Sequence, residues 1–451
     1  MLTGESDAVE KVAGDKLFSG SYLVSGIVLA QVVSVGADSY ANQLVKQAKT
    51  TKKTKSEIRD SIDKIIKILS VFVVPLGIAM FIKEYYFLDL GLKAAVEKTV
   101  ASIVNMIPDG LVLLSSVVMA VSVIKLARQK AIVQGLFSIE NLARVDVLCL
   151  DKTGTITQGT MEVTDEIIFE KEKLHERICA YLTAISEDTS TSEAIRKKYS
   201  EKINWNVKQT VDFSSKRKWG AVEFEKEGTF LLGAPEMLLG EAYANYKLQV
   251  DPYLERGERI LAFVKLLEGD SKQGRIERVQ PLSFLVLRDN LRPHVKETLD
   301  YFREQGIRLV LISGDNPKAV MKIGKRAGLS DAENYIDARE LKTPEQIAVA
   351  VKRYTVFGRV TPEQKRELVQ ALQHQGHTVA MTGDGVNDVL ALKEADCSIV
   401  MGSGCDVARK TAKVVLENSD FATMPKILAE GRRAINNLER SASLFLSLIH
   451  I

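Results

Sequence analysis

Cysteine and net charge are both scarce in this 451-residue sequence. The four cysteines have no paired metal-ligand spacing, which predicts reduced thiols rather than a metal site or a disulfide framework (Cys149, Cys179, Cys397 and Cys405). A formal net charge of +3 is too small to indicate a nucleic-acid partner. The sequence also lacks internal repeats and low-complexity segments, and its length predicts roughly three domains.

Long hydrophobic runs are restricted to two stretches. Residues 69–82 form the first, and isoleucines before it and aromatic residues after it extend it to a length that crosses a bilayer. Residues 99–124 form the second, whose only charge is Asp109. Lysine and arginine crowd before the first run and after the second, so the positive-inside rule predicts a transmembrane helical hairpin with both long flanks in the cytosol. A buried helix of a soluble domain is the alternative for the second run.

From residue 139 the pattern predicts strands that alternate with helices, as in a doubly wound α/β domain. Four apolar runs each lead into a loop that contains glycine or aspartate (residues 145–150, 307–312, 378–381 and 398–401), and residues 362–374 are typical of a helix between them. Mixed strands and helices from about 158 to 281 predict an inserted α+β domain. Short apolar segments near the start predict a β-rich piece (residues 22–24, 27–29 and 31–33).

The most informative motif is the segment from Asp151 to Thr157, which follows the apolar run 145–150. A strand that delivers an aspartate to its carboxyl end, beside Lys152 and small residues, suits nucleophilic attack on a phosphoryl group. Asp384 and Asp388 follow another strand and are spaced to bring carboxylate oxygens to one Mg²⁺ ion, and Asn387 between them can bond a phosphoryl oxygen.

Two further segments complete a phosphoryl-transfer set. Ser313 follows the run 307–312 and offers a hydroxyl, and Lys365 offers a positive charge. In order and spacing these motifs resemble those of the P-type ATPases, which have the haloacid-dehalogenase-like fold. The resemblance implies that Asp151 becomes an aspartyl phosphate. It also implies that the phosphoryl group is bound by Lys152, Thr153, Ser313, Lys365 and Asn387. The magnesium ion would be bound by Asp151, the Thr153 carbonyl, Asp384 and Asp388.

A soluble phosphatase of the same fold is the main alternative enzyme. Such enzymes carry an acid/base aspartate two residues after the nucleophile, where this sequence has Thr153, so its phosphoenzyme is expected to live longer. The segment Thr3-Gly4-Glu5-Ser6 resembles the actuator motif of the P-type ATPases, which implies that Glu5 positions the water that hydrolyses the phosphoenzyme. A membrane scaffold without activity is the non-enzymatic alternative.

A Walker-type glycine loop is missing, so ATP has to be held differently. Phe213 lies beside a run of cations that ends at Lys218, and an aromatic ring next to positive charges suits a purine and its phosphates. The resemblance assigns Phe213 to the adenine and Lys218 to the nucleotide, and it adds further residues to the ATP site (Glu193, Arg259, Gly233, Asp315 and Arg359). Leu232 departs from the family, whose members commonly have lysine before this Gly-Ala pair.

The second hydrophobic run contains Asn105, Pro108 and Asp109. Pro108 interrupts a helix and frees carbonyl groups, and an aspartate at bilayer depth indicates a functional site, although a structural kink is the alternative. Carbonyls and a carboxylate form a hard-oxygen site, and the Cys-Pro-Cys of soft-metal pumps is missing. Calcium is therefore the first choice of transported ion and magnesium the second, with a proton or alkali-metal ion left open.

Together these patterns predict an integral membrane ATPase of a bacterial plasma membrane, with large cytoplasmic domains and with ATP and Mg²⁺ as cofactors. Its expected partners are the transported cation and the lipid, and nothing indicates an obligate protein partner. The sequence is expected to lack membrane helices at both ends. The predicted division is an actuator fragment, a membrane hairpin, a first phosphorylation segment, a nucleotide-binding domain, a second phosphorylation segment and a stalk (1–55, 56–130, 131–157, 158–281, 282–427 and 428–451).

Overall fold

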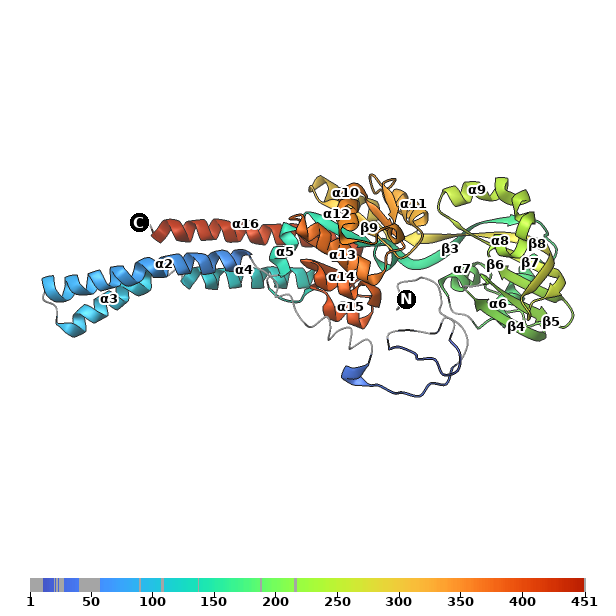
Figure 1. The fold of residues 1–451 in the computed structure, drawn as a ribbon, viewed down its shortest axis with the longest axis horizontal. Helices are drawn as coiled ribbons and strands as arrows, with labels where there is room; N and C mark the ends of the chain where they lie inside the picture. Colours follow the sequence, from blue (N-terminus) through green and yellow to red (C-terminus); the bar gives the residue numbers. More distant parts are fainter. Residues whose placement is uncertain are drawn as a thin grey trace.

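Two β-sheets and a bundle of long helices lie along one axis of the molecule (Figure 1). The structure is a computed structural model that describes residues 11–19, 21, 23, 28–39, 57–88, 91–106, 109–136, 138–186, 189–214 and 217–449. An eight-stranded sheet with its helices occupies the middle, a six-stranded sheet lies on one side of it, and the long helices project from the other side.

The central sheet has the strand order β1-β14-β13-β12-β2-β9-β11-β10. All neighbours are parallel except the edge strand β1, which pairs antiparallel with β14. Its strands are β1 (Ala131–Val133), β2 (Val147–Asp151), β9 (Arg308–Ile312), β10 (Tyr335–Asp337), β11 (Val356–Gly358), β12 (Val379–Thr382), β13 (Cys397–Met401) and β14 (Val414–Leu416). The predicted doubly wound domain is confirmed.

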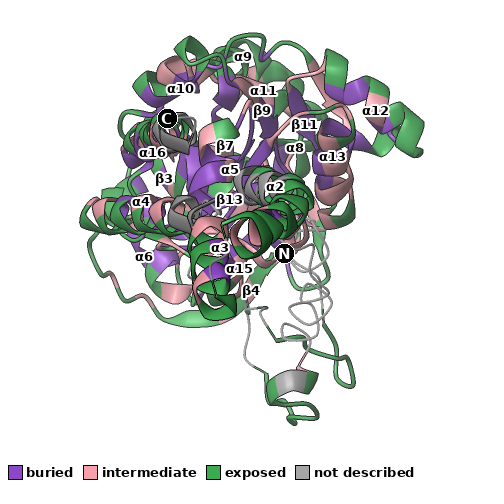
Figure 2. Cartoon of the chain, turned by 90° about the vertical axis from the view of Figure 1, so that its left-hand side faces the viewer, coloured by how far each residue is buried: buried purple, intermediate pink, exposed green. Residues whose placement is uncertain are grey.

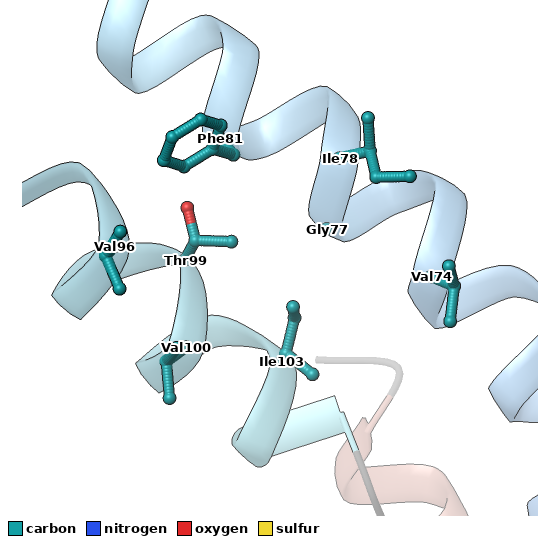
Figure 3. A pocket seen from close by; sticks show the side chains of 8 residues that line it. All are labelled: Val74, Gly77, Ile78, Phe81, Val96, Thr99, Val100 and Ile103. Carbon is teal, nitrogen blue, oxygen red and sulfur yellow. The ribbon is translucent and has the colours of Figure 1, made fainter. Parts of the chain in front are cut away.

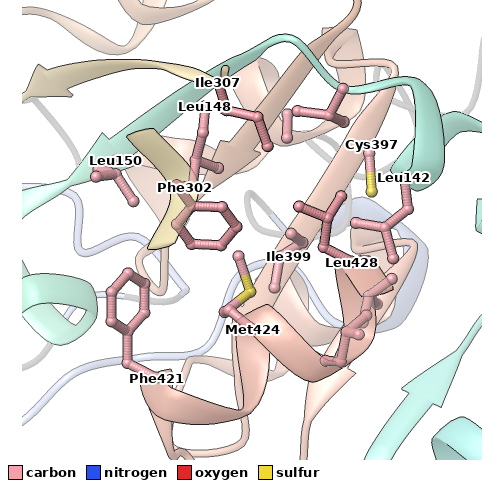
Figure 4. Packing of buried hydrophobic residues seen from close by; sticks show 14 of the residues in the cluster. Leu142, Leu148, Leu150, Phe302, Ile307, Cys397, Ile399, Phe421, Met424 and Leu428 are labelled. Carbon is pink, nitrogen blue, oxygen red and sulfur yellow. The ribbon is translucent and has the colours of Figure 1, made fainter. Parts of the chain in front are cut away.

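Strand β2 reads as an uninterrupted apolar run because helices cover both faces of the sheet. Leu148 and Leu150 point into the core on one face, and Val147 and Cys149 point into the core on the other. In the first core, Phe302 and Met424 lie beside Leu148 (Figure 4). The covering helices are α5 (Ser138–Arg144), α10 (Val295–Glu304), α11 (Pro317–Ala327), α12 (Pro344–Arg353), α13 (Pro362–His374), α14 (Val389–Glu394), α15 (Asp406–Thr411) and α16 (Met424–Ile449).

The six-stranded sheet is antiparallel, in the order β3-β8-β7-β6-β5-β4. Its strands are β3 (Thr157–Ile168), β4 (Val207–Ser214), β5 (Trp219–Phe224), β6 (Gly228–Gly233), β7 (Arg259–Asp270) and β8 (Arg275–Leu291). Helices α6 (Leu174–Ala184), α7 (Ser190–Lys198), α8 (Pro235–Leu239) and α9 (Lys247–Glu255) accompany it. The paired strands β3 and β8 run between the two sheets as a ribbon, as expected for an inserted α+β domain (Figure 1).

The projecting helices are α2 (Glu57–Ile82), α3 (Leu92–Met106) and α4 (Asp109–Arg128), together with the end of α16 (Figure 1). Among the described residues one helical stretch, Ser70–Phe87, is long and apolar enough to cross a membrane. Figure 2 shows that α2 and α3 are mostly exposed, unlike the helices on the central sheet. The second predicted run is divided between α3 and α4, so a second span across residues 99–124 stays a prediction.

Helices α2 and α3 pack closely where Gly77 faces Ile103, since a Cβ at Gly77 would lie 2.5 Å from the Ile103 Cδ1. Beside this crossing is an apolar hollow of about 360 Å³, into which Phe81 and Thr99 point (Figure 3). A hollow with apolar walls on exposed helices is consistent with a lipid or helix environment rather than water.

One expected strand is absent from the described part of the N-terminal region. Residues 31–33 have no strand partner, and Val32 and Val33 are 73% and 84% exposed. A strand needs neighbours for its backbone groups, and short apolar segments alone do not supply a sheet. Residues 28 and 29 of the expected strand 27–29 are likewise described, exposed and not in a strand. Most of the segment 22–24 lies outside the described residues, as does the lysine-rich stretch before α2.

Replacing Phe302 by alanine should destabilise the central domain by ~3–5 kcal/mol, because this ring is 2% exposed and its loss leaves a cavity. Urea unfolding followed by circular dichroism measures the change. Val349→Ala is the matched control, since Val349 is 67% exposed and its truncation should change the unfolding free energy by less than ~0.5 kcal/mol. Equal effects of the two changes would contradict this core.

Candidate active site

The candidate active site lies at the carboxyl ends of three neighbouring strands. Asp151 ends β2, Ser313 follows β9, and Asp384 follows β12. Pairing of β2 with β9 aligns Asp151 with Ile312, and the Asp151 N–H donates to the Thr382 Oγ1 at 3.2 Å. Polar groups that are far apart in the sequence therefore meet where an open α/β sheet binds its ligands.

Lys365 joins two of the carboxylates. Its Nζ donates to Asp151 Oδ1 and to Asp388 Oδ1, both at 2.6 Å, and all three residues are buried. Burial acts to lower the pKa of Lys365, but the charges of Asp151 and Asp388 raise that pKa above its ordinary value. The ammonium group therefore stays charged between the two acids. Removing it would leave buried carboxylates without compensation, at a cost of about 3–5 kcal/mol.

Burial raises the pKa of Asp151 to about 7, against the lowering effect of Lys365, while the charges of Asp388 and Asp384 add to the rise. Burial and then Asp388 raise the pKa of Asp384 to about 6. These shifts express the crowding of three acids around one lysine. A cation that bound here would lower both pKa values, because it would stabilise the charged carboxylates.

Asp151, Asp384 and Asp388 offer carboxylate oxygens that all lie within 4.8 Å of one another. This donor set fits Mg²⁺, which prefers carboxylates together with phosphate and water. Asp388 contributes least directly, because its Oδ1 accepts from Lys365 and its Oδ2 accepts from the N–H groups of Asp384 and Gly385. Asp388 therefore orients Lys365 and the loop, while Asp384 and Asp151, whose oxygens accept from Lys365 and from the Thr153 N–H, complete the donor set.

The loop after Asp151 has a conformation that requires glycine. Gly154 has a φ of +73°, and a Cβ there would lie 1.4 Å from the Asp384 Oδ2. Thr153 donates its N–H to Asp151 Oδ2 at 3.0 Å, while its side chain faces solvent. Arg292 holds the same loop, because its guanidinium donates to the Gly154 carbonyl at 2.6 and 3.0 Å and to the Ser419 carbonyl at 2.7 Å.

Lys152 points to acids other than the nucleophile. Its Nζ lies 2.6 Å from Asp315 Oδ2 and 3.3 Å from Asp289 Oδ2, and these carboxylates raise the pKa of Lys152 against the effect of burial. Asp315, predicted as a nucleotide ligand, thus belongs to the edge of the phosphoryl site. Arg359 joins this edge through its N–H, which donates to the Asp315 carbonyl at 2.8 Å, and its side chain pairs with Asp337 at 2.9 Å.

Two predicted phosphoryl-binding groups have spare hydrogen-bonding capacity. The Asn387 Oδ1 is buried and has no hydrogen-bond partner among the described residues, but this oxygen only accepts, so a phosphoryl oxygen would have to bond the Nδ2 amide group of Asn387. Ser313 is 3% exposed, and its Oγ accepts from the Asp315 N–H at 3.2 Å, which leaves its hydroxyl proton available. Asp289, near Arg292-Pro293, was noted in the sequence beside the phosphoryl-transfer set, but the sequence assigned neither Asp289 nor Arg292 a contact.

Three of the predicted nucleotide residues meet on neighbouring strands of the six-stranded sheet. Trp219 pairs with both Ser214 and Gly233, which brings Phe213, Lys218 and Gly233 to the same end of β4, β5 and β6. Gly233 is required there, because a Cβ would lie 2.5 Å from the Lys218 carbonyl.

The other two predicted nucleotide residues lie elsewhere in the same domain. Glu193 lies in the first turn of α7, which packs on β3, and Arg259 begins β7 opposite Leu287.

The predicted ion-site residues lie at the gap between two helices. Asn105 is near the end of α3, and Asp109 begins α4. Pro108 lies between them in the sequence. Both Pro108 and the predicted actuator residue Glu5 are outside the described residues.

Comparison with known families agrees with this geometry. The family model of haloacid dehalogenase-like hydrolases matches residues 145–396, and that of the P-type ATPase actuator domain matches residues 1–49. The chain belongs to the P-type ATPases of the haloacid dehalogenase-like family. Strand β2 and its aspartate fall inside the residues that the hydrolase model matches.

Relatives are similar along nearly the whole chain. A probable cation-transporting ATPase, exp7, of Streptococcus pneumoniae is 44% identical over 452 residues, which are 99% of this chain and 58% of that protein. The calcium-transporting ATPase CtpE of Mycobacterium tuberculosis is 39% identical over 99% of this chain and 56% of that protein. The chain thus spans less than two thirds of the length of the curated relatives it matches.

A solved structure of a zinc-transporting PIB-type ATPase in the E2.Pi state shares the fold. It aligns with a TM-score of 0.74 over 100% of this chain and 68% of that chain, at 22% sequence identity. At that identity the likeness concerns the fold alone. It confirms the haloacid-dehalogenase-like core with its inserted domain and says nothing about the transported ion.

Gly154→Ala should weaken Mg²⁺ binding by roughly tenfold or more, because the new Cβ displaces the Asp384 carboxylate from the ion site. Gly159→Ala is the matched control: its φ of +74° imposes the same backbone strain, but nothing lies within 4 Å of the added Cβ. Mg²⁺ titration by isothermal calorimetry measures both. Unchanged Mg²⁺ affinity in Gly154→Ala would show that Asp384 is not a ligand.

Proposed function

We propose that this chain forms an aspartyl phosphate at Asp151 from ATP, as the energy-coupling step of a cation pump. The observation that carries the proposal is the setting of Asp151. Its carboxylate ends a central strand, 2.6 Å from Lys365 Nζ, with Asp384 beside it and with Thr153 two residues later. Because Thr153 is no base, hydrolysis of the phosphoenzyme has no catalyst inside this loop, and the intermediate persists.

In the proposed step a carboxylate oxygen of Asp151 attacks the γ-phosphorus of ATP. The bond between that phosphorus and the bridging oxygen breaks, and ADP leaves with the bonding electrons. Lys365 opposes the rise that burial causes in the pKa of Asp151 and orients its carboxylate, while the Ser313 hydroxyl and the Asn387 amide nitrogen would donate to the oxygens of the transferred group. Bound Mg²⁺ supplies positive charge to those oxygens, and Asp151, the Thr153 carbonyl and Asp384 would hold it.

The ATP itself would bind on the inserted domain. Phe213, 37% exposed, would stack on the adenine, and Lys218 at the adjoining turn would lie near the phosphates. These residues and Asp151 belong to different domains that the ribbon of β3 and β8 connects. Phosphoryl transfer therefore requires the inserted domain to approach the central sheet.

Asp151→Asn should abolish acid-stable incorporation of the ATP γ-phosphate, because an amide cannot act as the nucleophile. Labelling with radioactive ATP, followed by acid precipitation and gel autoradiography, measures the loss. Asp146→Asn is the matched control, since Asp146 lies at the opposite end of β2 and accepts from Thr378 there. Equal labelling of the Asp151 variant and the unchanged chain would overturn the proposal.

For the transported ion we propose calcium. The gap between α3 and α4, with Asp109 at the start of α4, suits a hard cation that takes carbonyl and carboxylate oxygens. The printed names of the CtpE relatives specify calcium and support this choice. Magnesium is the second candidate. The pump would lie in the bacterial plasma membrane, with both sheets in the cytoplasm. Helix α2 would form one span, and residues 99–124, which contain the gap between α3 and α4, would form the other.

Made in a pump of the full length of its relatives, Asp109→Asn should reduce ATP-dependent uptake of radioactive calcium into inverted vesicles by roughly tenfold or more, because one charged ligand of the cation is lost. Glu97→Gln serves as control, since that acid on α3 is 67% exposed and should leave uptake unchanged. If the vesicles take up magnesium but not calcium, magnesium becomes the proposed transported ion. If they take up neither, both proposed ions are rejected.

A further inference from the structure

The ribbon that joins the two sheets carries a group of charges outside the active site. Arg288 on β8 donates from Nη2 to Glu162 Oε1 of β3 at 2.8 Å, and its Nη1 lies 3.9 Å from Glu258 Oε1. Glu258 directly precedes β7, which pairs with β8 at Arg259 and Leu287. Arg288 thus holds two acids, one exposed on the ribbon and one buried at the base of the inserted domain.

Two buried atoms of opposite charge in this group lack a hydrogen-bond partner among the described residues. They are the Glu258 Oε2 and the Arg326 Nη1. Glu258 is only 9% exposed, and Arg326 uses its Nη2 to donate to the Asp289 carbonyl at 3.1 Å. Leaving a buried charged group unpaired is unfavourable, so each of these atoms needs an explanation.

These two residues belong to the two parts that must approach each other. Glu258 moves with the inserted domain, and Arg326 lies on α11 of the central domain. The parts are already in contact here: Lys322, one turn before Arg326, donates to the Leu254 carbonyl, and a Cβ at Gly257 would lie 2.8 Å from the Lys322 Cβ. The turn that carries Glu258 therefore rests on the helix that carries Arg326.

The group also reaches the active site. Asp289, whose carbonyl accepts from Arg326, accepts from Lys152 through its side chain at 3.3 Å. Burial lowers the pKa of Arg326, and so does the charge of Arg288, while Asp289, Glu258 and Glu162 oppose this lowering. The acids that surround Arg326 thus come from both strands of the ribbon and from the base of the inserted domain.

We propose that Glu258 and Arg326 are positioning residues that form a direct ion pair in the domain arrangement from which ATP phosphorylates Asp151. This inference rests on the proposed function. A rotation of the inserted domain about the ribbon would bring the two unpaired atoms together, and one charge-assisted hydrogen bond would satisfy both. The Glu258–Arg326 ion pair stabilises the arrangement from which ATP phosphorylates Asp151, because the pair forms only in that arrangement. The ion pair between Arg288 and Glu162 is kept in either arrangement.

The test combines three variants with two sources of phosphate. Glu258→Gln, Arg326→Gln and the double variant are labelled from ATP, which needs the inserted domain, and from inorganic phosphate with Mg²⁺, which needs only the central domain. Each single change should slow labelling from ATP about tenfold, the loss expected for one charged hydrogen bond. The double variant should be no slower than the slower single variant. Labelling from inorganic phosphate and the affinity for ATP should stay within about twofold of the unchanged chain.

Glu162→Gln is the matched control, because it removes the other acid on Arg288 and should leave the rate from ATP unchanged. Arg326→Lys should restore part of the rate lost in Arg326→Gln, since it keeps the charge. The proposal is overturned if the losses of labelling rate multiply in the double variant, or if the single variants are labelled at an unchanged rate. It is also overturned if labelling from ATP and from inorganic phosphate slows equally, because that result indicates a purely structural role.

A distance measurement separates this inference from the proposed function. Spin labels at Leu248→Cys and Val349→Cys, both exposed positions, report the separation of the two domains in a chain whose Cys405 is replaced by serine. A non-hydrolysable ATP analogue should shorten that separation in the otherwise unchanged chain and leave it long in Glu258→Gln. If Asp151 is never labelled but the analogue shortens the distance only in the chain that keeps Glu258, the proposed function fails and the Glu258–Arg326 pair stands. Equal shortening in both chains overturns the pairing.

Discussion

The contact between Lys365 and two buried carboxylates is the interaction on which the rest of the site depends. Asp151, Asp384 and Asp388 crowd together at one sheet edge, where burial and repulsion by Asp388 raise the pKa of both Asp151 and Asp384. One ammonium group, 2.6 Å from both Asp151 and Asp388, offsets that repulsion. Lys365 comes from α13, which packs on one face of the sheet, and not from β2 itself. The nucleophile is therefore correctly placed only when the whole central domain is folded.

The strand order explains why this nucleophile can serve a moving domain. β2 lies between β9 and β12, and the chain leaves it at Asp151, turns through Gly154 and enters β3 at Thr157. It returns along β8, whose Asp289 reaches back to Lys152. The reacting carboxylate therefore lies at the root of the ribbon that carries the inserted domain. Arg292 anchors the loop between Asp151 and the ribbon to the central domain through the Gly154 carbonyl.

Local patterns predicted most of the central domain, and long-range contacts account for what they missed. Helix α13 begins and ends as expected at residues 362–374, because Thr361 and Gln364 form a capping box around Pro362. The orientation of Lys152 was not predictable, since its partners Asp289 and Asp315 lie more than a hundred residues away and no periodicity links them. The expected strand at 31–33 is missing for the opposite reason: its apolar pattern is present, but no strand within the described part of the chain pairs with it.

The helices that would carry the cation are joined to the same sheet through packed contacts. Helix α4, which begins at Asp109, ends beside β1 and packs against α16, where Lys125 lies 3.5 Å from the buried Glu430. Helix α16 also packs on α5, which directly precedes β2. Helix α16 therefore contacts both the helix that begins at Asp109 and the helix that precedes β2.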